Sequence, residues 1–172
     1  MKTLLRILAF GPLAIAILVG ALSVMGWDKI WVAGFGPADL GAVTFRQFAK
    51  TPEPNQVLIC PPNLCNPEDV DSESPIYGLS VSDLKSKLLE SLKQESNLER
   101  VDTGNTNQLR FIQRSAWMKF PDTIRVQLIS LEENSLTLAL YGQSQIGESD
   151  LGVNKQRAER WLSRLKKYET QN

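Results

Sequence analysis

The sequence predicts an α+β domain that follows an N-terminal transmembrane helix and a proline-rich lead-in. Three observations predict this: a long uncharged apolar run, two segments with helical periodicity, and strand-like segments between them that are separated by turn signals. The expected architecture is a four-stranded antiparallel sheet with two helices packed on one face, in the order α-β-β-β-β-α. Residues 1–31 form the tail and anchor, 32–79 the lead-in, and 80–172 the α+β domain.

The first segment to justify is the apolar run from Ile7 to Trp27, which contains 21 residues without a charge. As a helix this run is about 31 Å long, which is enough to cross the hydrocarbon core of a membrane. Lys2 and Arg6 precede it and favour an N-terminus in the cytoplasm, with the rest of the chain across the membrane. The alternative is a cleaved signal peptide, because small residues at 19–21 resemble a cleavage site. Both interpretations export the domain.

The lead-in is marked by proline, since seven of the nine prolines lie between residues 34 and 75. Proline at this density excludes long helices and central strands. Val43, Phe45, Phe48 and the run 57–59 give the segment more apolar side chains than a free linker carries. We therefore expect an ordered, extended segment that lies across the domain.

Cys60 and Cys65 are the only cysteines, and four residues separate them. In an exported protein such a pair most simply forms a disulfide. A redox-active pair or two metal thiolates are the alternatives. The spacing is not Cys-x-x-Cys, however, and there is no histidine or further thiol to complete a metal site.

Helical periodicity appears on both sides of the predicted sheet. The first helix starts near Ser80, with Ser80 or Ser82 as its cap, and places Leu84 and Leu88 on one apolar face. The last helix runs from about Leu151 to Lys167, with Trp161 on its buried face and its basic residues, Arg157 among them, turned outward. Both helices are amphipathic and are expected to cover the same sheet.

Four candidate strands lie between these helices, with turns at 103–105, 120–122 and 132–134. In the third and fourth strands apolar and polar residues alternate, which predicts one buried face and one wetter face for each. The predicted strands are Glu99–Asp102, Gln108–Lys119, Thr123–Leu131 and Ser135–Ser144.

Composition excludes several classes of function. The chain beyond residue 6 carries 17 basic and 19 acidic residues, which argues against nucleic acid as a partner. The absence of histidine removes the commonest general base and the commonest transition-metal ligand. No cofactor, metal or catalytic residue is predicted, and whether the protein is an enzyme stays open, with the balance against it.

Several separated motifs occur in one order and resemble a known family. They cover about Phe35 to Leu165 and comprise Gly36–Gly41, Pro54–Gln56, Cys60–Pro62 with Cys65, Gln113–Ser115, Phe120–Asp122, Leu138–Tyr141, Ser149–Asn154 and Arg157 to Leu162. This pattern resembles the domain of unknown function 1499 family. The resemblance implies a bacterial envelope or membrane-associated protein and implies no established reaction.

The sequence departs from the family pattern in the stretch before the last helix. Family members often have Ser-Arg-Ser where this chain has Gly142-Gln143-Ser144, and a basic residue where it has Glu148. An anion site built on that arginine is therefore not expected to carry over to this chain.

The candidate ligand-binding residues gather around the start of the last helix. A polar pocket there would use helix amides and arginine, both of which favour negative charge. In the competing interpretation Asp150 caps the helix, and Arg114 and Arg157 pair with carboxylates. Asp122 is a further ion-pair candidate but lacks a second acid. The candidate residues are Arg114, Ser115, Ser144, Ser149, Asp150, Asn154 and Arg157.

The sequence thus predicts an inner-membrane protein of bacteria, with a single pass through residues 7–27 and a periplasmic C-terminal domain, or a secreted periplasmic protein if the leader is cleaved. The expected role is a binding or structural module for a lipid or an envelope protein. The alternative is a histidine-free hydrolase or transferase built on Asp, Arg and Ser. A large apolar cavity would favour a lipid binder, and a tight cleft with converging Asp and Arg would favour an enzyme.

Overall fold

The computed structural model describes residues 11–12, 14–17, 19–21, 23–24, 26–132 and 135–170. None of the helices in this part of the chain is both long and apolar enough to cross a membrane. The predicted membrane segment, residues 7–27, is covered only in part, because residues 7–10, 13, 18, 22 and 25 lie outside the described residues. The membrane anchor therefore stays a prediction.

The described residues form one sheet of six strands in the order β2-β1-β6-β5-β4-β3. All neighbours are antiparallel except β1 and β2. The strands are β1 (Gln56–Cys60), β2 (Ser72–Glu73), β3 (Leu98–Val101), β4 (Gln108–Arg114), β5 (Pro121–Glu132) and β6 (Ser135–Ser144).

The predicted number of four strands was wrong because the lead-in contributes two more. The run 57–59 between its prolines is free to pair, and β1 adds to the edge of β6, with Leu58 opposite Tyr141. The short β2 then pairs in parallel with the end of β1. Strand β6 thereby becomes a central strand.

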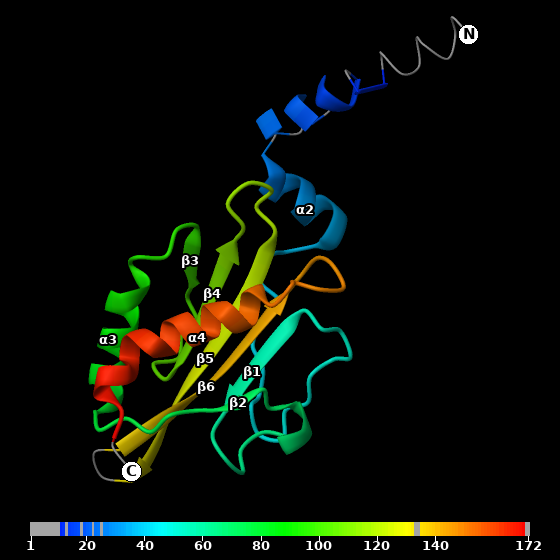
Figure 1. Ribbon diagram of the computed structural model, residues 1–172. Helices are drawn as coiled ribbons and strands as arrows, with labels where there is room; N and C mark the ends of the chain where they lie inside the picture. Colours follow the sequence, from blue (N-terminus) through cyan, green and yellow to red (C-terminus); the bar gives the residue numbers. More distant parts are fainter. Residues whose placement is uncertain are drawn as a thin grey trace, which may run out of the picture.

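Helices α3 (Val81–Leu92) and α4 (Val153–Leu165) cover one face of the sheet (Figure 1). Of the two candidate caps, Ser80 is the one that caps α3, because its hydroxyl accepts a hydrogen bond from the Asp83 amide at 3.2 Å. Helix α2 (Trp27–Phe35) lies beyond one end of the sheet. Two 3₁₀ turns, η1 (Pro67–Asp69) and η2 (Lys166–Tyr168), complete the elements.

The main core lies between the sheet and the two helices. Trp161 of α4 is fully buried there and meets Phe111 of β4 edge to face, with ring centroids 5.6 Å apart. Leu84 and Leu88 of α3 pack into the same cluster. The mixed α+β architecture with two helices on one face is therefore confirmed.

A second core lies on the opposite face of the sheet, where residues 43–48 of the lead-in cover β1 and β6. Phe45 is buried there beside Leu58 and Ala139, and the Phe48 ring is 4.6 Å from the Tyr141 ring. The prediction of one wetter face for the last two strands was therefore wrong. Arg125, which should face water, is only 4% exposed and donates to the Gly41 carbonyl at 2.7 Å.

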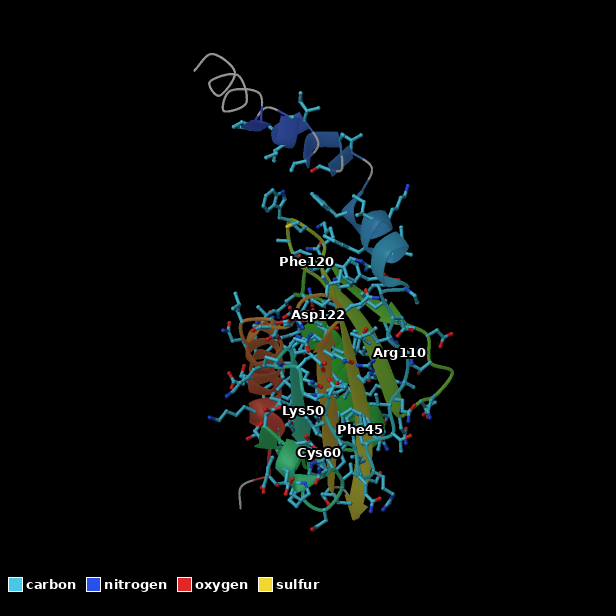
Figure 2. The ribbon with its side chains drawn as sticks, turned by 90° about the vertical axis from the view of Figure 1, so that its right-hand side faces the viewer. Phe45, Lys50, Cys60, Arg110, Phe120 and Asp122 are labelled. Atoms are coloured by element: carbon cyan, nitrogen blue, oxygen red, sulfur yellow. A yellow bond between two sulfur atoms is a disulfide. The ribbon has the colours of Figure 1, made fainter. Side chains whose placement is uncertain are left out.

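The predicted disulfide between Cys60 and Cys65 is confirmed, with the Cα atoms 6.2 Å apart. Cys60 is the last residue of β1, so the bridge closes the loop that leaves this strand. Both cysteines belong to the second core, together with Phe45. The cross-link therefore holds the end of β1, where Figure 2 labels Cys60, to the loop that leads to η1.

Candidate functional site

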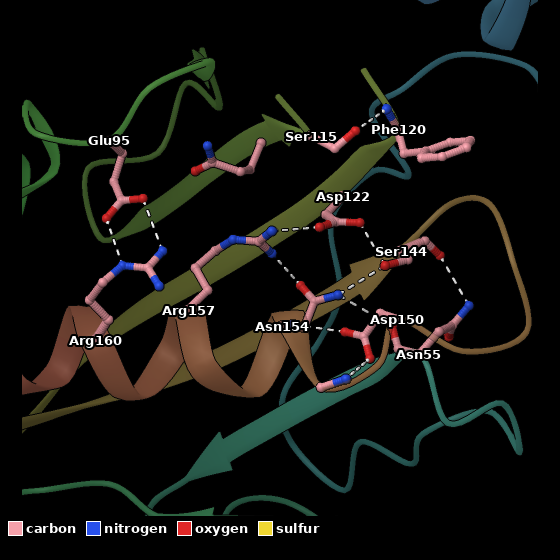
Figure 3. Close-up of polar contacts among 12 residues, drawn as sticks. Asn55, Glu95, Ser115, Phe120, Asp122, Ser144, Asp150, Asn154, Arg157 and Arg160 are labelled. Atoms are coloured by element: carbon pink, nitrogen blue, oxygen red, sulfur yellow. Dashed lines mark hydrogen bonds and ion pairs between the residues drawn. The ribbon is translucent and has the colours of Figure 1, made fainter. Parts of the chain in front are cut away.

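The start of β5, the end of β6 and the start of α4 meet at one end of the sheet. The antiparallel register sets Asp122 of β5 directly opposite Ser144 of β6. Residues 145–152 lead from β6 to α4, which brings Asn154 and Arg157 over these strand ends (Figure 3). Polar side chains from three elements therefore share one small volume.

A buried ion pair joins two of these elements. The Arg157 Nη2 atom lies 2.6 Å from Asp122 Oδ2, and only 7% and 11% of the two side chains are exposed. The other Asp122 oxygen accepts a 2.6 Å hydrogen bond from the Ser144 hydroxyl. The second Arg157 nitrogen donates to the Asn154 side-chain oxygen. Such bonds offset the desolvation penalty of burying the two charges.

Asn154 connects this ion pair to β6 and to the lead-in. Its side-chain nitrogen Nδ2 donates to Ser144 Oγ at 3.0 Å and lies 3.4 Å from the Asn55 backbone carbonyl. Asn55 in turn donates to the Gly147 carbonyl at 2.6 Å. The space is tight, because a Cβ at Gly142 would lie 2.8 Å from the Asn154 oxygen. Glycine is therefore required at this position of β6.

Asp150 occupies the amides at the start of α4. Its two oxygens accept hydrogen bonds from the amides of Gly152 at 2.9 Å and Asn154 at 2.7 Å. Ser149 Oγ accepts a further bond from the Leu151 amide at 3.2 Å. These short-range bonds use protein oxygens where an external anion would otherwise bind.

Beside this network lies a pocket with a volume of about 370 Å³. Apolar side chains from the β4–β5 turn and the β6–α4 connection form its walls, and the polar network forms part of its lining. The lining residues are Ser115, Phe120, Asp122, Ser144, Ile146, Gly147, Ser149, Asp150, Leu151, Val153 and Arg157.

The sequence matches the family described as "Protein of unknown function (DUF1499)" over residues 50–165. This range is well over half of the chain and contains every residue of the network and the pocket. The chain belongs to this family. A comparison with curated proteins finds no match. The resemblance deduced from the separated motifs is thereby confirmed, while the envelope location it implied stays a prediction.

Within this DUF1499 domain, five of the seven candidate ligand-binding residues line the same pocket. They are Ser115, Ser144, Ser149, Asp150 and Arg157. Asn154 lies behind them, 1% exposed, and holds Ser144 and Arg157 in place. The interpretation of Arg157 as an outward-facing residue was wrong, since it is 6% exposed. Ligand binding by these residues stays a prediction.

Arg114 is not among the residues that line the pocket. Its Nη1 atom lies 2.8 Å from Glu99 Oε2 across the β3–β4 pair, in a separate shallow hollow. Gln113 of β4 lies opposite Asp122 of the network. Successive strand residues point to opposite faces of the sheet, so the Arg114 side chain lies on the other face. The ion pair with a carboxylate, which was one of the two expected outcomes, is what the structure shows for Arg114.

Two pocket residues that the candidate set lacked come from the Phe-Pro-Asp motif at 120–122. Phe120 contributes a wall, and Asp122 holds Arg157. The motif stood out in the sequence, but as a turn before a strand expected to begin at Thr123. Strand β5 begins at Pro121 instead, which puts Asp122 inside the sheet and opposite Ser144.

A second cluster of charges lies along α4, away from the pocket (Figure 3). The Glu95 carboxylate is contacted by Arg160 at 3.1 Å and by Arg164 at 2.8 Å. Burial raises the pKa of Glu95, but hydrogen bonds and charge from the two arginines outweigh it and leave the pKa below its ordinary value. The cluster joins the segment after α3 to α4 and stabilises their packing.

The chemistry available at the pocket follows from these partners. Both Asp122 oxygens already accept hydrogen bonds, and both terminal nitrogens of Arg157 already donate. The network is thus largely self-contained, while the apolar walls offer surface to a ligand. Among the residues that the structure describes, no group of three His, Cys, Asp or Glu side chains is placed to hold a metal ion.

Proposed function

We propose that this DUF1499 protein is a membrane-anchored envelope protein whose periplasmic domain binds a lipid or another small amphipathic molecule in the pocket at the start of α4. The anchor is the segment 7–27, and a cleaved leader would instead release the same domain into the periplasm. The motifs quoted for the family and the charge-free length of 7–27 support this location.

The observation that carries the proposal is that the apolar residues of the pocket are free to contact a ligand, whereas its charged residues already have partners. Phe120, Ile146, Leu151 and Val153 supply apolar wall. The charged groups of the lining have partners within the protein, since Asp122 pairs with Arg157 and Asp150 accepts from backbone amides. Burial of apolar surface contributes about 25 cal/mol per Å², so such walls favour an apolar group. A few polar groups such as Ser115 and Ser149 at the margin would orient a polar end of the ligand.

A histidine-free hydrolase or transferase is the alternative from another class. Ser144 donates to Asp122 at 2.6 Å, which is the arrangement of a hydroxyl and a carboxylate that such an enzyme would need. Ser144 is only 8% exposed, however, and it also accepts a bond from Asn154. These contacts favour a structural role for Ser144 over attack on a substrate.

The test is affinity purification of the detergent-solubilised full chain, followed by mass spectrometry of both lipids and proteins. We expect one class of lipid to co-purify in near-constant ratio to the protein. A protein partner without lipid would replace the lipid proposal by a scaffold. Conversion of added lipid into a cleaved product would support the enzyme instead, and reproducible absence of both lipid and protein would contradict a binding role.

A further inference from the structure

Exposed apolar side chains of the domain gather at the end where α2 lies. Trp117 is 71% exposed and Leu151 is 88% exposed, although both are large apolar residues. Single exposed apolar side chains are common, but a contiguous group marks an interaction surface. We define the apolar end as Val32, Phe35, Trp117, Leu151 and Val153, each at least 47% exposed.

The opposite end of the sheet provides a comparison within the same molecule. Strand β5 starts at Pro121, beside the apolar end, and reaches Leu131 ten residues later, about 33 Å away. Leu131 and Ile76 are exposed there at 45% and 39%, beside Glu73 and Glu169. The two ends therefore differ in their most exposed apolar groups, since Leu131 and Ile76 are well below Trp117 and Leu151 in exposure.

Helix α2 is fixed to the apolar end by contacts far apart in sequence. The Trp31 indole donates to the Met118 carbonyl and stacks on Phe120, with ring centroids 4.8 Å apart. Gln145 donates to the Pro37 carbonyl at 2.6 Å just after α2. The chain that comes from the predicted membrane segment is therefore attached at this end, close to Phe120 (Figure 2).

The pocket and the apolar end share side chains. Leu151 and Val153 line the pocket and also belong to the exposed group, while Phe120 joins the pocket to Trp31. Trp27 stacks on Trp31 with centroids 5.8 Å apart, at the end of the predicted membrane segment. Tryptophan is the residue that membrane interfaces favour.

We propose that the apolar end lies against the phospholipid bilayer that carries the anchor, with Trp117 and Leu151 inserted at the interface, and that the pocket opens onto this bilayer and takes an acyl chain from it. The proposal deepens the proposed function and rests on it. Charged residues of both signs lie beside α2, since Asp28 and Glu99 line one hollow with Lys119 and Arg114. Contact therefore depends on apolar insertion, and zwitterionic phosphatidylcholine is a sufficient probe.

The experiment uses the full chain reconstituted into phosphatidylcholine vesicles. Single thiols are introduced as Trp117→Cys, Leu151→Cys, Leu131→Cys and Ile76→Cys and labelled with an environment-sensitive fluorophore, since the native cysteines are joined in a disulfide. All four positions are exposed, so the substitutions remove no core contact. We expect a blue shift, and loss of most of the fluorescence with interfacial doxyl lipids, at positions 117 and 151 only.

Equal, water-like emission at all four positions would overturn the proposal. Contact between copies, seen as thiol cross-links at position 151 without lipid quenching, would also overturn it. Lipid bound to the purified protein is measured in the same preparations. Retained lipid with water-like probes would refute only the membrane contact, whereas quenched probes without retained lipid would refute only the occupied pocket.

Discussion

Arg157 Nη2 lies 2.6 Å from Asp122 Oδ2, and this buried contact connects the second turn of α4 to the first residues of β5. The two partners are 35 positions apart in the sequence. Ser144 and Asn154 complete their hydrogen bonds, so four residues from three elements act as one unit. The walls of the neighbouring pocket depend on the position of this unit.

The ion pair predicts a strong asymmetry between single and double variants. Arg157→Gln leaves the Asp122 charge buried without its partner and should destabilise the fold by about 3–5 kcal/mol. Asp122→Asn combined with Arg157→Gln removes both charges and should recover a large part of that loss. Urea unfolding of the detergent-solubilised chain measures both. If the loss in the double variant equalled the sum of the losses in Arg157→Gln and in Asp122→Asn alone, the two charges would not interact.

Gly142 should not tolerate a side chain. In Gly142→Ala the new Cβ meets the Asn154 oxygen at 2.8 Å and Val57 at 3.3 Å, so overpacking should cost about 1–3 kcal/mol. Gly78→Ala is the matched control, because its Cβ meets only Thr170 at an ordinary 3.5 Å. Thermal unfolding should show a lower Tm for the first variant alone, and an equal Tm for both would refute the tight contact.

The Glu95 carboxylate should make the stability of the fold decrease as the pH falls in the acid range. Its pKa is lowered in the folded state, because the arginines outweigh the burial that raises it. Its contribution is therefore fully present above the unfolded pKa of about 4.3 and is lost as the pH falls through the folded value. Glu95→Gln should lower Tm at pH 7, with a difference that disappears in acid. Glu90→Gln is the control, because Glu90 is exposed and pairs with the similarly exposed Lys93. This variant should show little change in Tm at either pH.

The disulfide should stabilise by restricting a small loop. Cross-linking residues five apart removes about 2 kcal/mol of unfolded-state entropy on the chain-entropy model. Replacing both cysteines by serine should therefore lower the free energy of unfolding by about that amount. Reductant should lower the Tm of the wild-type protein and leave that of the double-serine variant unchanged. A shift in both would indicate an effect of the reductant elsewhere.

Local sequence signals were sufficient for the existence and order of α3, α4 and the strands β3 to β6. The predicted end of β4 at Lys119 was wrong, because the strand ends at Arg114 and a turn follows it. Strand β6 has the predicted bounds, and α3 begins directly after its predicted cap, because side-chain periodicity and capping are properties of short segments. The addition of β1 to β6 was not predictable in this way. Pairing between residues 81 to 87 positions apart depends on tertiary contacts that proline content does not report, and it buries both faces of β6.

In the candidate site, too, local signals were sufficient for some residues, while others depended on strand pairing that the sequence does not report. Five of seven residues meet in one pocket, and four of these five, from Ser144 to Arg157, are close in sequence around a helix start. The fifth, Ser115, comes from the β4–β5 turn. Arg114 was included on an assumed register, and Asp122 was omitted because β5 begins two residues earlier than its alternation suggests. A register shift between Ser130 and Glu132 also changes how β5 and β6 align, and no turn signal encodes it.

The central claim, that the pocket holds the apolar part of a lipid, is tested most directly by a matched pair of charge variants. Val153→Glu places a carboxylate in the pocket wall at the first residue of α4, where the helix dipole tolerates it. Gln156→Glu adds the same charge at an exposed position of the same turn. Lipid bound per purified full chain is measured by mass spectrometry. We expect wild type and Gln156→Glu to retain the same lipid and Val153→Glu to lose most of it, whereas equal retention in all three would contradict the claim.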